Sequence, residues 1–135
     1  MTTTSQNGAF PTLQGQKFMN LITFRKNGEA VSTPVWFAEE GNRLYVTSLM
    51  DTGKIKRIRN NSRVQLQASN ARGKPLGPTQ EATARILPQS EGDRANGLLV
   101  KKYGLQKRAV DLMIKLRGNW DKRGFVEIMP STNDR

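Results

Sequence analysis

The sequence predicts a mainly β fold, a small closed or partly open antiparallel β-barrel with a few short helices. About six segments alternate apolar and polar residues, as half-buried strands do. Most of them are joined by short runs of turn-forming residues, which favours hairpins. The helical crossovers of a parallel sheet are missing and no GxGxxG occurs, so the pattern argues against a Rossmann domain.

Both ends of the chain are polar. We expect residues 1–9 and residues 130–135 to be flexible tails. A short helix is predicted from Pro11 to Met19, because proline is favoured in the first turn of a helix. The length of 135 residues, without an internal repeat or linker, predicts one domain over residues 1–135.

The first hairpin is predicted around Asn27-Gly28, a dipeptide that favours a type I′ turn. Its strands are residues 20–25 and 30–38, both rich in β-branched and aromatic side chains. Pro34 lies in the second strand and has no N–H to donate. We therefore expect this strand at a sheet edge or at a bulge.

A third strand and a short basic helix follow. Residues 43–48 alternate as a strand and come directly after a turn at Glu40-Gly41-Asn42. The helix is predicted from residue 52 to residue 61. Its buried side chains are expected to be Ile55 and Ile58, because residues three apart share one face of a helix.

The second half of the chain combines strands with a longer helical segment. Residues 70–78 form a loop rich in glycine and proline. Residues 90–117 carry an apolar stripe of helical period, and Gly104 is expected to divide them into two helices. The strands of this half are predicted at residues 64–69, 79–87 and 124–129.

The chain contains neither cysteine nor histidine. This excludes disulfides, thiolate zinc sites and Ser-His-Asp or Cys-His nucleophiles, and we expect no metal. An enzyme with this composition would take its chemistry from a bound cofactor. No signal peptide and no bilayer-crossing run is found in the sequence, and a chain free of cysteine suits a reducing compartment. We therefore expect a cytoplasmic protein with no membrane partner.

The net charge is +11, from 22 basic and 11 acidic residues. The excess is concentrated: residues 52–80 contain seven basic residues and no acid, and residues 101–123 contain eight against two. Such patches attract polyanions, including nucleic acids, anionic membranes and multiply charged coenzymes. A solvated surface that confers solubility is the alternative interpretation.

The segment from Arg43 to Asn61 contains the strongest local motif. A strand ends just before Asp51-Thr52-Gly53-Lys54, where a helix begins. Thr52 suits the N-cap position, where its oxygen would accept an N–H of the first helical turn. The other N–H groups and the helix dipole would then face an anion beside Lys54, the arrangement that holds a phosphate. An ordinary capped surface helix is the alternative.

Several segments, in this order and spacing, resemble a known family. The split β-barrels related to pyridoxamine 5′-phosphate oxidase bind flavins or deazaflavins, and the similarity is strongest to the branch dependent on coenzyme F420. It implies a split β-barrel of the FMN-binding type, a flavoprotein that forms a homodimer with the cofactor at the interface. The matching segments are LITFRKNGEAVSTPVWFAEEGNRLYVTS (21–48), TGKIKRIRNNSRVQL (52–66), ARGKPLG (71–77) and KKYGL (101–105).

The resemblance implies which residues contact the cofactor. Thr52 and Lys54 match the hydroxyl-x-Lys pair that holds the cofactor phosphate, and Lys56 and Arg57 match further basic contacts. It assigns no catalytic residue. The Arg-x-x-x-x-Lys pattern of the vitamin B6 oxidases is missing from residues 31–38, so that reaction is not expected. The strand residues implied beside the ring system and ribityl chain are Thr33, Pro34, Val35, Trp36, Thr47 and Ser48.

Charge favours coenzyme F420 over FMN. Both present a tricyclic ring and a ribityl phosphate chain, but the deazaflavin continues into a tail with several carboxylates. The basic residues of the helix and the following loop suit that longer anion. FMN remains the alternative cofactor.

The resulting hypothesis is an oxidoreductase that transfers hydride between the cofactor and a small organic substrate. Tyr103 is a candidate proton donor, although a tyrosine on an apolar helical stripe more often belongs to the core. One alternative is a barrel that binds FMN, a deazaflavin or a tetrapyrrole without turnover. A weaker one is a basic barrel that binds nucleic acid, for which few aromatic stacking residues are present.

Overall fold

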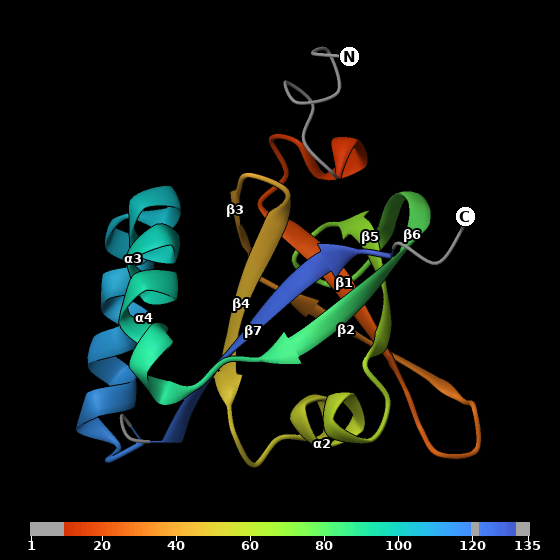
Figure 1. Ribbon diagram of the computed structural model, residues 1–135. Helices are drawn as coiled ribbons and strands as arrows, with labels where there is room; N and C mark the ends of the chain where they lie inside the picture. The colour runs from red at the N-terminus through yellow and green to blue at the C-terminus, as the bar shows by residue number, and fades with distance from the viewer. Residues whose placement is uncertain (1–9, 120–121, 132–135) are drawn as a thin grey trace.

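The computed structural model describes residues 10–119 and 122–131 (Figure 1). The expected tail at residues 1–9 lies outside the described residues, as do residues 132–135 of the expected C-terminal tail. Pro130 is the last residue of a strand. Within the described part of the chain, no helix is long and apolar enough to cross a membrane.

The fold is mainly β, as the sequence predicts, and consists of one antiparallel sheet curled into a split barrel (Figure 1). The sheet has seven strands in the order β2-β1-β5-β6-β7-β4-β3, and every neighbouring pair is antiparallel. The strands are β1 (Phe18–Phe24), β2 (Ala30–Val35), β3 (Ala38–Glu40), β4 (Arg43–Leu49), β5 (Arg63–Ser69), β6 (Pro75–Ile86) and β7 (Arg123–Pro130).

The seventh strand arises because the segment predicted as one strand at residues 30–38 is two. Trp36 and Phe37 separate β2 from β3, and these two strands occupy opposite ends of the sheet order. Pro34 therefore lies in an edge strand, which confirms the expectation drawn from its missing N–H.

The barrel interior is filled by the inward side chains of the strands. Met19 and Leu21 of β1 are buried there together with Leu44 and Val46 of β4. The helix α2 (Gly53–Asn60) lies across one end of the barrel, at the bottom of Figure 1, and contributes Ile55 and Ile58 to this core as predicted. The sequence pattern is decisive here, because one face of each element is consistently apolar.

Two further helices lie outside the barrel: the first covers β4 and β7, and the second packs against the first (Figure 1, left). They are α3 (Gly92–Tyr103), which follows the short η2 (Gln89–Glu91), and α4 (Leu105–Leu116). Gly104 separates them with φ of 61°, which confirms the predicted break, since only glycine adopts this conformation readily. A second core under α3 contains Tyr45, Leu99 and Phe125.

Two local predictions of secondary structure are wrong. The helix expected from Pro11 to Met19 is only the 3₁₀ turn η1 (Pro11–Leu13), and β1 begins at Phe18. Apolar residues at Phe10 and Leu13 anchor one turn, but the sequence then loses its helical period. The loop expected at residues 70–78 is shorter, because β6 begins at Pro75. The pairing of β5 with β6 is irregular between Gln67 and Ser69, where a strand tolerates prolines.

The first hairpin turn is in the expected place but has a different type. Gly28 has φ of 92°, whereas no described residue other than glycine has positive φ, so Asn27 does not adopt the type I′ conformation. The Gly28 N–H donates to the Arg25 carbonyl at 2.9 Å, and the Arg25 N–H donates to the Glu29 carbonyl at 2.8 Å. This is a type I turn followed by a left-handed glycine, which forms a G1 bulge.

Candidate functional site

The first turn of α2 brings together four of the residues predicted to bind a cofactor: Ser48, Thr52, Lys54 and Arg57. Thr52 occupies the N-cap position, with extended backbone. Its hydroxyl donates to the Leu49 carbonyl at 2.9 Å and lies 3.0 Å from the Ser48 hydroxyl. It does not accept a helical N–H, so the predicted cap is wrong in this detail. The first-turn N–H groups consequently lack a side-chain cap.

Lys54 and Arg57 place two positive charges at this end of the helix. Lys54 is half-buried, and burial, with a further contribution from Arg57, holds its pKa below the ordinary value. The Arg57 side chain folds back over the first turn, since a Cβ added at Gly53 would lie 2.7 Å from its Nη1. Arg57 Nε donates to the Thr23 hydroxyl at 2.6 Å. Burial and then Arg25 lower the pKa of Arg57.

This cluster has the properties of an anion site. Among the residues that the structure describes, neither Lys54 nor Arg57 forms an ion pair with a carboxylate. Two neighbouring cations that are partly removed from water repel one another until an anion joins them. Uncapped helical N–H groups at the positive end of α2 add donors of the same kind. The donor set therefore fits a phosphate.

The predicted strand residues on β2 lie along the open edge of the sheet. Thr33 is opposite Leu21 and Pro34 is opposite Asn20 of β1, and no strand pairs with the other side of β2 in the described sheet. Val35 is buried in the barrel core, so its side chain faces away from any ligand. What β2 offers at its edge is unpaired backbone, which can hydrogen-bond to ring heteroatoms.

Trp36 is in a different environment. Its ring stacks on Tyr103 with centroids 4.5 Å apart and planes 9° from parallel. The Phe37 N–H donates to the Tyr103 hydroxyl at 2.9 Å, and that hydroxyl lies 2.8 Å from the carbonyls of both Phe37 and Lys17. Burial raises the pKa of Tyr103 to about 12. Tyr103 thus links α3 to the β2–β3 connection through ring stacking and hydrogen bonds, which is a structural role.

Two predicted residues lie apart from the cluster. Thr47 donates its hydroxyl to the Gly124 carbonyl of β7 at 3.1 Å, a cross-strand contact within the sheet. Lys56 is exposed on a face of α2 that Lys54 and Arg57 do not share. Sequence proximity suggested Lys56 as a contact, whereas helical geometry separates it from the other two.

Sequence reasoning did not identify the partners of this cluster on the strands. Thr23 is fully buried in β1 and is one of the two polar residues in that mostly apolar strand. This interruption of the apolar run was the sequence signal that could have pointed to Thr23. Arg25 acts on Arg57 through charge, although the two are far apart in sequence.

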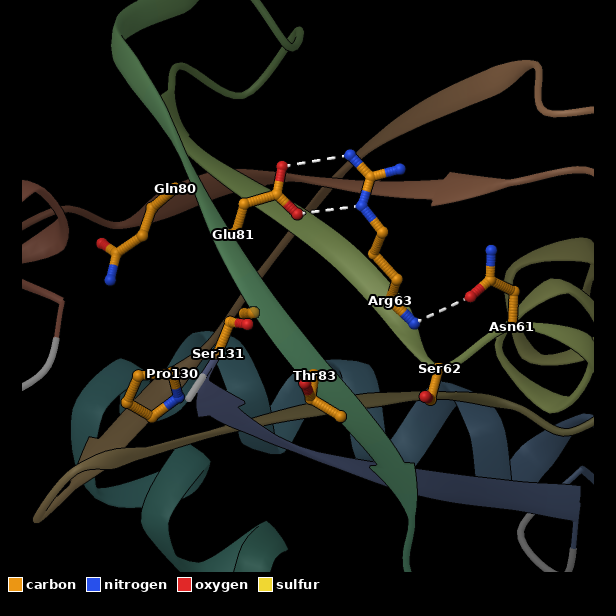
Figure 2. A pocket seen from close by; sticks show the side chains of 9 residues that line it. Asn61, Ser62, Arg63, Gln80, Glu81, Thr83, Pro130 and Ser131 are labelled. Atoms are coloured by element: carbon orange, nitrogen blue, oxygen red, sulfur yellow. Dashed lines mark hydrogen bonds and ion pairs between the residues drawn. The ribbon is translucent and has the colours of Figure 1, made fainter. Parts of the chain in front are cut away.

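A cavity of about 710 Å³ lies on another part of the surface (Figure 2). It contains none of the predicted cofactor residues. Figure 2 shows the Arg63 guanidinium facing the Glu81 carboxylate, with nitrogen–oxygen distances of 3.0 and 3.1 Å. The cavity is lined by Asn61, Ser62, Arg63, Gln80, Glu81, Ala82, Thr83, Pro130 and Ser131.

Comparison with known proteins agrees with the fold. A FAD-binding protein from Mesorhizobium loti superposes with a TM-score of 0.58 at 18% identity, covering 92% of this chain and 88% of that one. An F420 reductase gives 0.54 at 18% identity, with coverage of 93% and 94%. The heme storage protein HutZ from Vibrio cholerae gives 0.65 at 12% identity, with coverage of 89% and 85%.

At such low sequence identities, these superpositions show similarity of fold alone. No curated protein matches the sequence. The pyridoxamine 5′-phosphate oxidase family matches residues 9–123, which include the whole barrel up to the start of β7 and the anion cluster at α2. The chain belongs to the pyridoxamine 5′-phosphate oxidase family.

Proposed function

We propose that this protein is a flavin- or deazaflavin-dependent oxidoreductase, which transfers hydride between its cofactor and a small organic substrate. The observation that carries the proposal is the pair of partly buried cations, Lys54 and Arg57, which lack a carboxylate partner at the start of α2. Such a pair is costly to maintain unless an anionic ligand neutralises it. A cofactor phosphate is the ligand that the family membership suggests.

The chain's own residues would bind and orient the cofactor. Lys54, Arg57 and the first-turn N–H groups of α2 would hold the phosphate, and the open edge of β2 would hydrogen-bond the ring. When bound, the cofactor supplies the hydride chemistry. Tyr103 is not proposed as a proton donor, because its hydroxyl is engaged by backbone groups and its pKa is raised to about 12.

We further propose a homodimer in which a second copy completes the cofactor groove. One chain offers cations and an open sheet edge at the predicted site, whereas the cavity of about 710 Å³ is lined by other residues. This is the arrangement expected if the wall of the groove comes from a partner chain. We place the protein in the cytoplasm, which its lack of cysteine supports.

Coenzyme F420 is the favoured cofactor and FMN the alternative. The preference for coenzyme F420 is supported by basic residues near both ends of the edge strand β2. Arg57 reaches Thr23, which is opposite Val31, near the start of β2. The basic turn that contains Arg72 and Lys74 lies at the other end, since a Cβ at Gly73 would be 3.7 Å from Pro34. A cofactor with several carboxylates makes fuller use of these cations than FMN does.

A second candidate function is binding of a flavin, deazaflavin or tetrapyrrole without turnover. The observation in its favour is the engaged hydroxyl of Tyr103, the residue that the sequence suggested as the proton donor. Haem binding by this route would have to dispense with histidine ligands, because the chain has none.

The decisive experiment is equilibrium binding of FMN and of oxidised coenzyme F420 to protein freed of bound cofactor, followed by ring fluorescence. The Lys54→Ala variant should weaken binding by at least tenfold, the usual effect of losing a charge-assisted phosphate contact. Lys56→Ala is the matched control, since it removes an equal charge from the exposed face of the same helix. Equal losses in both variants would indicate general electrostatic attraction and contradict a built phosphate site.

Turnover requires a separate measurement. The protein with reduced coenzyme F420, or with reduced FMN, should oxidise it when a suitable organic acceptor is added. Tight binding that depends on Lys54, without oxidation by a broad acceptor panel, would favour the binding protein. Binding of neither cofactor would refute both functions.

A further inference from the structure

The helix α4 is inverted with respect to the rest of the protein: polar side chains face inward and leucines face water. Lys107 is only 1% exposed and forms an ion pair with Asp111, one turn later. Asp111 also accepts a hydrogen bond from Asn96 Nδ2 of α3 at 3.2 Å. The contact between α4 and α3 is therefore held partly by a charged network.

The outward face of α4 is an apolar stripe. Leu105, Ala109, Leu112 and Leu116 recur every three or four residues and so lie in one row along the helix. Leu105 is 83% exposed and Leu116 is 74% exposed. Met113 is beside this row and is also exposed. Large apolar side chains aligned on one face usually mark a contact surface rather than a solvated one.

The rest of the chain offers little to cover this stripe. The residues outside the described ranges are polar apart from a few, and among them only Met1 and Trp120 are large and apolar. Two side chains cannot bury a row that runs the length of a twelve-residue helix, about 18 Å. These residues therefore do not supply a cover of matching length.

Charge indicates which occupant fits. Residues 101–117 contain six basic residues and one acid, Asp111, which is paired with the buried Lys107. Lys102 donates to the Phe37 carbonyl, and the other exposed cations of this segment are Lys101, Arg108, Lys115 and Arg117. Arg108 and Arg117 are exposed on either side of the leucine row. A second copy of this chain would bring the same cations against them, which opposes self-association through this face. An anionic occupant is favoured.

We propose that α4 docks on an anionic lipid surface. An amphipathic helix with leucines on one face and flanking basic residues lies in the plane of a bilayer, with its apolar side among the acyl chains and its cations at the headgroups. Helices α3 and α4 lie outside the barrel, so this contact leaves the barrel in water (Figure 1). The inference is independent of the proposed cofactor chemistry.

The proposal departs from the expectation of no membrane partner. That expectation concerned segments that cross a bilayer, and none is found among the described helices. Peripheral docking needs only a short amphipathic helix. The sequence showed its basic and apolar residues, but not that the leucine side faces outward.

The test is sedimentation of the full-length protein with unilamellar vesicles. Vesicles of phosphatidylglycerol and phosphatidylcholine should bind the protein, whereas vesicles of phosphatidylcholine alone should bind it at least tenfold more weakly. The Leu112→Gln/Leu116→Gln variant should lose at least tenfold in affinity, because burial of each leucine is removed. The matched control is Leu76→Gln, which changes an exposed leucine on β6 and should bind as the wild type does.

The charge contribution has its own pair of variants. Arg108→Gln/Arg117→Gln should weaken binding to anionic vesicles by roughly tenfold to thirtyfold, given the usual effect of each basic residue near such a surface. Lys26→Gln/Arg59→Gln removes the same charge from exposed positions in the first hairpin turn and on α2, away from α4, and should have a much smaller effect.

Three results would overturn the proposal. The first is failure of the wild type to bind anionic vesicles, and the second is equal binding to uncharged vesicles. The third comes from sedimentation velocity without lipid: if Leu112→Gln/Leu116→Gln changes the association state of the protein, a second copy covers the stripe. An unchanged association state, together with lost vesicle binding, supports docking on lipid.

Discussion

Trp36 and Tyr103 stack face to face, with ring centroids 4.5 Å apart and planes 9° from parallel. Trp36 lies where the chain leaves β2 for β3, and Tyr103 is the last residue of α3. The Tyr103 hydroxyl also meets the backbone of Phe37, the next residue after Trp36. One aromatic pair thus connects the helical layer to the split between the two edge strands.

Removing the Tyr103 hydroxyl should therefore reduce stability. We expect Tyr103→Phe to lower the free energy of unfolding by about 1–2 kcal/mol, because the Phe37 N–H loses its acceptor while the ring stack remains. Tyr103→Leu, which also removes the stack, should cost more. Urea titration followed by far-UV circular dichroism measures both. A Tyr103→Phe variant that kept full stability but lost turnover would instead identify the hydroxyl as a proton donor.

Glu127 should make stability dependent on acid pH. It is buried, which raises the pKa of its carboxyl, but donors on Arg85, Arg43 and Tyr45 outweigh burial and hold that pKa below the ordinary value. A depressed pKa stabilises the fold above the ordinary value of about 4.3, and this stability is lost as the pH falls through the native pKa.

We expect Glu127→Gln to lower the free energy of unfolding at pH 7 by about 1–3 kcal/mol, through loss of these charged hydrogen bonds. The difference from wild type should shrink as the pH falls below about 4, where the wild-type carboxyl also loses its charge. Urea titrations at several pH values measure it. Glu81→Gln is the control: its ion pair with Arg63 is exposed, so it should change stability little. A difference that stays constant with pH would contradict this explanation.

Two glycines of α3 should respond to alanine in opposite directions. At Gly92 a Cβ would lie 2.8 Å from the ring of buried Phe125, so Gly92→Ala should destabilise the protein by about 1–3 kcal/mol through overpacking. At Gly97 nothing lies within 4 Å of the added Cβ. Gly97→Ala should therefore stabilise by up to about 1 kcal/mol through helix propensity. Thermal unfolding of the two variants measures both, and a shift of the same sign would refute the placement of α3 on β7.

Lys54 should limit cofactor binding at alkaline pH. Burial and Arg57 lower its pKa, so its charge is lost at a lower pH than that of an ordinary lysine. Only the charged form attracts a phosphate. As the pH rises, affinity for FMN or coenzyme F420 should therefore begin to fall before pH 10.5 is reached, and binding in that range should take up protons. Fluorescence titrations between pH 7 and pH 10.5 measure this. In Lys54→Arg the fall should disappear, since arginine stays charged.

Much of the fold was predictable because each strand carries its own pattern. The inward residues of β5 alternate with polar ones, so their burial follows from the sequence, whereas in β4 Tyr45 is also buried because its face of the strand belongs to the second core. Pro34 predicted an edge strand by its missing N–H, and Gly104 predicted a helix break. At the site, the basic first turn of α2 was predicted, and so was the place of Lys54 in it.

Other features depend on local backbone geometry that the residue types do not fix. Asn27-Gly28 favours a type I′ turn, but it also fits the last two positions of a type I turn that ends in a left-handed glycine, and the hydrogen bond from Arg25 to Glu29 closes that second arrangement. The Thr52 hydroxyl had two possible partners, a helical N–H or the Leu49 carbonyl, and the path of the preceding turn selected the second.

The antiparallel barrel and the basic helix can be read from the sequence, because alternation and charge are local properties of the chain. Contacts between elements are needed to show that Arg57, and not Lys56, meets Thr23, and that the leucines of α4 face outward while Lys107 is buried. An amphipathic pattern defines two faces of a helix but not which one packs inward. The surface against which the helix packs determines which face is buried.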